Sequence, residues 1–369
     1  MDFLLDDHIS IKENALQGRY VTHGQIQEVL RKLPALFSVR KIGESVQGRS
    51  IESITFGSGD TKILMWSQMH GNESTTTKAV FDLMGLVRER PDKVADILEK
   101  CTITIIPMLN PDGAEVYTRV NANGVDLNRD AQERSQPESV VLRQEFENLA
   151  PDFCFNLHDQ RTIFNVGETA RPATVSFLAP AHDEERSISG SRALGMKLIV
   201  AMNEALQQII PGRVGRYDDS FNANCVGDTF QMLGTPTVLF ESGHSPNDYQ
   251  REDTRKYIFI SLLKALTVIT EGALEGYALD KYSEIPENRK QFVDIMVRNA
   301  GIINEKLKEK GTFAFLYQEV LEGGAIRFVP KMVEIEPGRS YFAHQYFDCS
   351  IPSDLQKLKT QSYYPMLKF

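Results

Sequence analysis

Short apolar runs of strand length alternate along this chain with longer segments of helical periodicity, and this alternation constrains the fold more than any other feature. The runs that read as buried strands cover residues 63–66, 102–107, 153–158, 174–179 and 236–241. Helical patterns follow or separate them at 75–90, 91–100, 137–149, 183–210 and 249–271. Such alternation is typical of an α/β fold, in which helices pack on both faces of a sheet.

Two regions flank this alternation. A helical lead-in ended by Pro34 precedes it, followed by two strand-like runs at 37–56 that predict a β-hairpin. Beyond residue 275 the pattern turns polar, and we expect a helix near 288–309 before short β-like runs. We therefore expect a main domain at 1–275 and a small helix-plus-β accessory region at 276–369. The β-like runs of this region cover 312–317, 326–328 and 332–335.

Composition excludes several classes of protein. The 369 residues are 41% hydrophobic, which is enough for a full core, and the net charge is −9. A negative chain disfavours nucleic acid and anionic membranes as partners. No apolar run approaches the roughly 20 residues of a membrane-spanning helix. The first seven residues lack the features of a signal peptide, so we expect a cytoplasmic protein.

The four cysteines are far apart in sequence and form no CxxC motif. Cys101 and Cys154 lie in apolar strand-like runs. We expect buried, reduced thiols rather than disulfides or a metal cluster.

Three of the predicted strands end at, or just before, a histidine or a carboxylate. His70 and Glu73 follow the run at 63–66, while His158 and Glu241 each end a strand. The carboxyl ends of parallel strands meet at one edge of a sheet, where α/β proteins bind ligands. Imidazole and carboxylate are ligands that Zn²⁺ prefers. The pattern predicts a metal site of His70, Glu73 and His158. Glu241 would take a proton from a metal-activated water and pass it to a leaving amine.

Each of these residues alone has a simpler interpretation. A single histidine at a strand end is more often a core residue, and an isolated HxxE pair is a weak signal. The combination of two such histidines with Glu73 and Glu241 favours the metal site. We expect His244 in a loop, and we expect surface positions for the remaining histidines, which are His8, His23, His182 and His344.

A long polar stretch at 110–130 is longer than a simple connection requires, which favours a functional loop. It carries Arg119 and Arg129. A guanidinium can stabilise an oxyanion that develops on a carbonyl, or pair through two hydrogen bonds with a substrate carboxylate.

Several short motifs occur along the chain in the same order as in zinc carboxypeptidases of the M14 family, and this resemblance covers roughly residues 40–270. The resemblance implies an eight-stranded mixed sheet flanked by helices, with one zinc ion per chain held by His70, Glu73 and His158. The motifs that carry it are His70-Gly71-Asn72-Glu73, Asn110-Pro111-Asp112-Gly113, Arg119, Asp126-Leu127-Asn128-Arg129, His158 and Phe240-Glu241.

The resemblance also implies roles for single residues. Glu241 matches the general base, and Arg119 matches the arginine that stabilises the oxyanion. Asn128 and Arg129 match the pair that binds a free substrate carboxylate. Asp126 matches the carboxylate that orients the first ligand histidine. Tyr217 is the nearest candidate for a substrate-binding tyrosine on a mobile loop.

The predicted function is therefore hydrolysis of an amide or peptide bond next to a free carboxylate. Deacylases of N-acyl amino acids and murein-peptide amidases are alternatives with the same zinc chemistry, and a non-catalytic binding protein is a third. Asp228 lies where the family builds its specificity pocket; it either selects a basic side chain or is a loop or cap residue. Asp159-Gln160-Arg161 either contacts substrate or forms a solvated loop, and we favour the loop.

Overall fold

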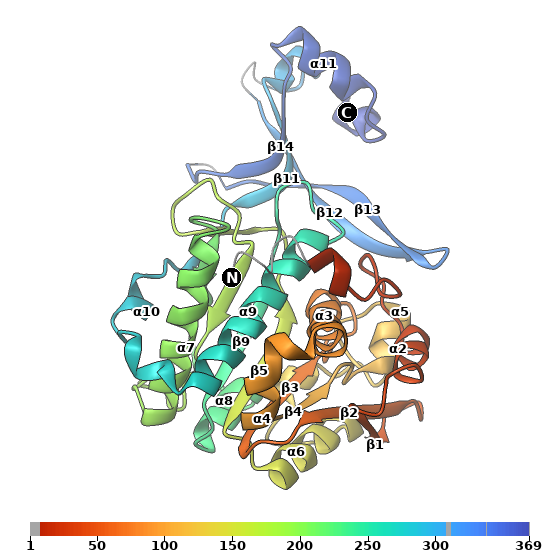
Figure 1. Ribbon diagram of the computed structural model, residues 1–369. Coiled ribbons are helices and arrows are strands. Elements are labelled where there is room, and N and C mark those ends of the chain that lie inside the picture. Colours follow the sequence, from red (N-terminus) through yellow and green to blue (C-terminus); the bar gives the residue numbers. More distant parts are fainter. Residues whose placement is uncertain (1–7, 308–310, 337, 369) are drawn as a thin grey trace.

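The computed structural model describes residues 8–307, 311–336 and 338–368, and its largest element is an eight-stranded mixed sheet (Figure 1). This sheet, with helices on both faces, confirms the predicted fold. The strands lie in the order β1-β2-β4-β3-β5-β9-β7-β8. Their bounds are β1 Ser38–Glu44, β2 Ser50–Gly57, β3 Thr61–Ser67, β4 Cys101–Ile106, β5 Phe153–Asp159, β7 Val175–Leu178, β8 Val214–Arg216 and β9 Thr237–Ser242.

Four adjacent strands at the centre of the sheet, β4, β3, β5 and β9, run parallel to one another. The expected hairpin is present as β1 and β2, which pair antiparallel at one edge. Because β3, β5 and β9 are parallel neighbours, the residues that end them lie together. His158 is directly opposite Glu241 in the β5–β9 register.

Side chains of the central strands alternate between two apolar cores. Ile63 and Met65 of β3 belong to the larger core, which α3, α7 and α9 cover. Leu64 and Trp66 face the opposite way, into a core shared with α6 and α8. The helices of this part of the chain are α2 His23–Leu30, α3 Thr75–Glu89, α4 Ala95–Lys100, α5 Pro111–Val116, α6 Pro137–Leu149, α7 Gly190–Gln207, α8 Val226–Met232, α9 Glu252–Glu271 and α10 Lys281–Glu284.

A separate four-stranded sheet lies above the main body in Figure 1, with α11 farthest from it. Its strand order is β13-β12-β11-β14. A short strand, β10 (Asn288–Lys290), connects the two parts by pairing with β6 (Phe164–Val166) of the main body. The other elements are β11 Phe292–Arg298, β12 Phe313–Glu322, β13 Ala325–Val333, β14 Phe342–Asp348 and α11 Pro352–Lys359.

The helix expected near 288–309 is wrong, because β10 and β11 occupy the first half of that range. β11 is an inner strand between β12 and β14, and all its residues except Arg298 are buried. Burial on both faces removes the polar–apolar alternation by which a strand is recognised from sequence. The accessory region is β-rich, and its longest helix within the described residues is α11, after the strands.

Two smaller expectations are also wrong. The helix expected from residue 183 begins only at Gly190, where the Ser189 hydroxyl accepts a hydrogen bond from the Arg192 amide. His8, expected at the surface, is 4% exposed, and its Nε2 lies 2.8 Å from a carboxylate oxygen of Asp82. Cys101 and Cys154 are buried and free, as predicted.

None of the helices in the described residues is both long enough and apolar enough to cross a bilayer. Residues 1–7, on which the expectation about a signal peptide rests, lie outside the described residues.

Candidate active site

The turn after β3 places His70 at the edge of the sheet. Gln68 has a left-handed backbone with φ 48°, and its side-chain amide donates to the carbonyls of Val21 and Gly71 at 3.0 and 2.9 Å. A Cβ atom on Gly71 would lie 2.0 Å from the backbone of Gly113. Glycine is therefore required here, because the turn packs directly on the loop that begins at Asn110.

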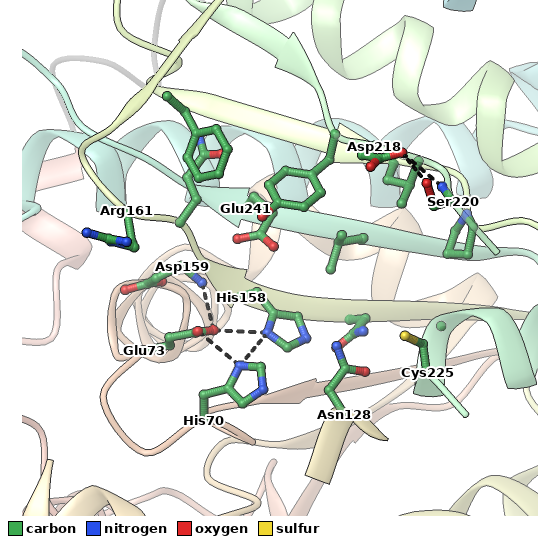
Figure 2. Close-up of a pocket in the computed structure, with 18 of the residues that line it drawn as sticks. His70, Glu73, Asn128, His158, Asp159, Arg161, Asp218, Ser220, Cys225 and Glu241 are labelled. Atoms are coloured by element: carbon green, nitrogen blue, oxygen red, sulfur yellow. Dashed lines mark hydrogen bonds and ion pairs between the residues drawn. The ribbon is translucent and has the colours of Figure 1, made fainter. Parts of the chain in front are cut away.

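Three donor atoms converge where β3 and β5 end (Figure 2). Glu73 lies between two imidazoles: its Oε1 is 2.9 Å from His70 Nδ1, and its Oε2 is 2.9 Å from His158 Nδ1. The two Nδ1 atoms are 3.1 Å apart. All three side chains are buried, and their ligand atoms lie within 4.8 Å of one another. The structure thus brings together the three residues predicted as metal ligands.

Asp126 fixes the orientation of His70. Its Oδ1 lies 2.9 Å from His70 Nε2. A carboxylate only accepts hydrogen bonds, so this contact holds the proton on Nε2 and leaves a lone pair on Nδ1, which faces the other donors. Burial alone would lower the pKa of His70, but the nearby Glu73 and Asp126 carboxylates raise it.

The donor set fits a divalent cation. Burial lowers the pKa of His158 and so favours the neutral ring, the form that binds metals. Burial would raise the pKa of Glu73, but the two imidazoles hold it well below its ordinary value, so the group is a carboxylate. Two imidazoles and one carboxylate form a donor set suited to zinc.

Glu241 lies beside this cluster, at the end of β9. It is 8% exposed, and its Oε2 is buried without a hydrogen-bond partner among the described residues. Burial raises the pKa of Glu241 well above its ordinary value, and the negative charges of Glu73 and Asp159 raise it further. A carboxyl group with a raised pKa and an unused oxygen is suited to accept a proton from water and to donate it again.

Arg119 is held by two carboxylates. Its Nε donates to Asp126 Oδ2 at 3.0 Å, and its Nη1 lies 3.2 Å from Glu73 Oε1. The side chain is still 47% exposed and lines the cavity next to the candidate metal ligands. Asp126 therefore positions both His70 and Arg119 through its two oxygens.

Asn128 and Arg129 follow Arg119 in the same stretch of chain, in a short turn of helix at Leu127–Arg129. The Asn128 side-chain oxygen accepts a hydrogen bond from the Val226 amide at 3.1 Å, at the start of α8. This contact leaves the side-chain NH₂ group to donate into the cavity that Asn128 lines. Arg129 lines the cavity too, and its Nη1 donates to the Asn128 carbonyl at 2.7 Å. The pair presents donors suited to a carboxylate.

The cavity has a volume of about 460 Å³, and its wall includes every residue predicted to act on substrate. Tyr217 lines it and packs against Phe164, with ring centroids 5.5 Å apart. Asp228 lines it from the first turn of α8, and burial raises its pKa to about 7. Asp126 alone among the predicted site residues does not line the cavity and instead supports it from behind.

Apart from Asp126, the sequence did not indicate the groups that support the metal cluster. The Asp159 amide donates to Glu73 Oε2 at 3.1 Å, and Asp159 Oδ2 accepts from the Thr75 amide at 3.0 Å. Arg19 contacts Asp159 Oδ2 at 3.4 Å and both carboxylate oxygens of Glu319 at 3.2 Å. Arg19 is 6% exposed. Asp159 could have been suspected from its position after His158, but neither Arg19 nor Glu319 lies in a motif.

Comparison with known proteins confirms the resemblance to zinc carboxypeptidases. Residues 23–159 match the family model described as zinc carboxypeptidase. An uncharacterised protein of Zymomonas mobilis is 30% identical over 131 residues, which are 34% of this chain and 34% of that protein. The catalytic chain of human carboxypeptidase N is 29% identical over 127 residues, 28% of each chain. The chain thus aligns with about a third or less of the length of these relatives.

Solved structures share the fold at lower identity. Carboxypeptidase A from Helicoverpa armigera superposes with a TM-score of 0.55 and 18% identity over 74% of this chain and 80% of that one. A metallo-carboxypeptidase from Burkholderia cenocepacia gives 0.53 and 18% over 68% of both chains. A metallo-carboxypeptidase from Pseudomonas aeruginosa, in complex with (2-guanidinoethylmercapto)succinic acid, has a TM-score of 0.52 and 18% identity. The match covers 68% of this chain and 69% of that one.

Proposed function

We infer that this chain is a zinc-dependent metallocarboxypeptidase, which hydrolyses the amide or peptide bond next to a free carboxylate. One observation carries the inference: a single cavity is lined by the three candidate metal ligands, by Glu241 and by the donors of Asn128 and Arg129. The Oε2 atom of Glu241 has no hydrogen-bond partner among the described residues. The sequence match to zinc carboxypeptidases, with motifs in the same order, supports it.

In the proposed mechanism, Arg129 and Asn128 bind the terminal carboxylate of the substrate and so fix the adjacent amide next to the candidate metal ligands. Glu241 takes a proton from the attacking water and delivers it to the leaving amine. Arg119 donates to the carbonyl oxygen as negative charge develops there. Zinc held by His70, Glu73 and His158 would polarise the carbonyl and acidify the water.

The direct test is a panel of peptides that differ only at the carboxyl end. We expect peptides with a free carboxylate to be hydrolysed at least about 100-fold faster than the same peptides with a terminal amide, since only the former can pair with Arg129. Release of the last residue would be followed by mass spectrometry. N-acyl amino acids and murein peptides belong in the same panel. If N-acyl amino acids or murein peptides are turned over faster than the free-carboxylate peptides, that class replaces peptides as the assigned substrate, and the zinc chemistry is unchanged.

Asp228 gives the proposed enzyme a preference for a basic terminal residue. Its carboxyl group lines the cavity on α8, near Asn128, and an ionised carboxylate there would pair with a lysine or arginine side chain. The compound in the Pseudomonas complex likewise carries a guanidino group together with a succinic acid. Because the pKa of Asp228 is raised to about 7, the group is neutral below that pH and charged above it.

We therefore expect KM for a peptide ending in lysine to fall about 10-fold as the pH rises from 6 to 8, since Asp228 gains its charge in that window. KM would be measured across this range for peptides ending in lysine and in alanine. The alanine peptide serves as the control, because Asp228 has no charge to pair with there. A lysine preference that survives unchanged in Asp228→Asn would contradict the assignment.

We also propose the division of the chain into a catalytic domain at 1–275 and an accessory region at 276–369. The two parts are in contact at more than one point. β10 pairs with β6 at the wall of the cavity, and Glu319 of β12 pairs with Arg19 behind the metal cluster. The accessory region therefore acts as a structural partner of the site.

A further inference from the structure

We propose that the cleft contains a second anion-binding subsite, formed by Arg161 and Lys290, that selects substrates with an acidic residue on the amino side of the scissile bond. The proposal rests on the proposed carboxypeptidase function and assigns it a specificity. Arg161 comes from the loop after β5, and Lys290 comes from β10 of the accessory region. Both line the same cavity as the candidate metal ligands.

Arg161 differs from the two preceding residues, Asp159 and Gln160, because its side chain makes no contact that fixes it within the described residues. Asp159 supports the metal cluster, and the Gln160 amide donates to the Ala173 carbonyl at 2.7 Å and to the Ser176 hydroxyl at 3.0 Å. The Arg161 guanidinium makes no ion pair or hydrogen bond with any residue that the structure describes, and its side chain is exposed to the cavity. Arg119, by contrast, is paired with two carboxylates.

Lys290 is directed toward the cavity by strand register. It lies opposite Phe164 in the antiparallel β10–β6 pair, and opposite residues in such a pair share one face. Both residues line the cavity, and the Lys290 ammonium is 5.9 Å from the centre of the Phe164 ring. Arg289, the preceding residue, points to the opposite face and pairs with Glu168 at 3.3 Å. Within the described parts of the chain, Lys290 has no carboxylate partner.

The position of these cations identifies the part of the substrate that they meet. In Figure 2, Arg161 and Asn128 lie on opposite sides of His158 and Glu73. A substrate whose terminal carboxylate is bound by Asn128 and Arg129 therefore extends past the metal ligands toward Arg161. The residue that precedes the scissile bond then reaches Arg161, in the cavity that Lys290 also lines. A glutamate or aspartate side chain matches them, since a guanidinium binds a carboxylate through two parallel hydrogen bonds and an ammonium adds a second charge.

The test compares two peptides that are blocked at the amino end and have a free carboxyl end. They share their last residue and differ only in glutamate or glutamine immediately before it. In wild type we expect kcat/KM to be about 10-fold higher for the glutamate peptide, a ratio that falls as salt is added. Lys290→Ala and Arg161→Ala should each bring the ratio close to one. Arg289→Ala, which removes the neighbouring charge from the other face, should keep it. Lys290→Glu should reverse the preference toward a lysine peptide.

A binding measurement separates failure of the subsite from failure of the proposed function. Calorimetric titration of both peptides into zinc-loaded Glu241→Gln protein reports the preference without turnover. Equal affinities, or equal kcat/KM values in wild type, would overturn the subsite. A glutamate preference in binding that disappears when Lys290→Ala is added would support the subsite. If the wild-type protein cleaves neither peptide while this preference is present, the carboxypeptidase assignment fails and the subsite stands.

Discussion

Replacing Glu241 with glutamine is expected to lower kcat by about 10³-fold while zinc content stays near one ion per chain. Glutamine has nearly the same shape as glutamate but cannot take a proton from water. Glu241 is the cavity carboxyl group whose Oε2 has no partner among the described residues and whose pKa is raised well above its ordinary value by burial. Turnover would be measured at saturating peptide, and zinc by elemental analysis of the same sample.

The matched control is Asp218→Asn, which neutralises another carboxylate of the same cavity. Asp218 is hydrogen-bonded to Ser220 and lies away from the metal cluster in Figure 2. We expect its kcat to stay within about threefold of wild type, because Asp218 has no part in the proposed proton transfer. Near-normal turnover in Glu241→Gln would refute the assigned base and leave zinc binding unaffected.

The second large effect is expected on the metal itself. His158→Ala should reduce zinc from about one ion per chain to less than about 0.1 after dialysis, because only His70 and Glu73 of the three donors remain. The loss also leaves the Glu73 carboxylate without the imidazole that contacts its Oε2 at 2.9 Å. Activity should be lost in parallel, and circular dichroism should show whether the fold is kept.

His182→Ala is the control for this variant. His182 is only partly buried, and its closest carboxylate is that of Asp183 at 3.3 Å, outside the metal cluster. It should retain a full complement of zinc. A folded wild-type protein that binds no zinc after metal is added would refute the metal site. Zinc retained by His158→Ala at full occupancy would show that His158 is not a ligand.

The sequence was most informative where function depends on residues close together in the chain or placed at strand ends. His70 and Glu73 are three residues apart on one turn, and His158 and Glu241 end adjacent parallel strands. Once the strands are recognised, the geometry of a parallel sheet requires that such residues meet. The eight-stranded sheet itself was expected from the family resemblance, since β8, with only three residues, carries little pattern of its own.

Contacts between distant segments could not be predicted in the same way. Lys290 was assigned to a helix, although its strand register directs it into the cavity. Pairing with β6 decides that conformation, and no local pattern reports a partner more than a hundred residues away. The burial of His8 has the same origin, because its partner Asp82 lies on α3.

The link between Arg19 and Glu319 has a consequence for how the protein matures during synthesis. Glu319 belongs to β12, so a growing chain has completed all eight strands of the main sheet before this carboxylate exists. Until then Arg19, which is almost fully buried in the finished protein, lacks the closer of its two carboxylate partners. A buried guanidinium short of a partner is costly. We therefore expect the residues around the metal cluster to reach their final positions only after the accessory sheet has left the ribosome. Until then, the nascent chain is expected to lack the proposed hydrolase activity.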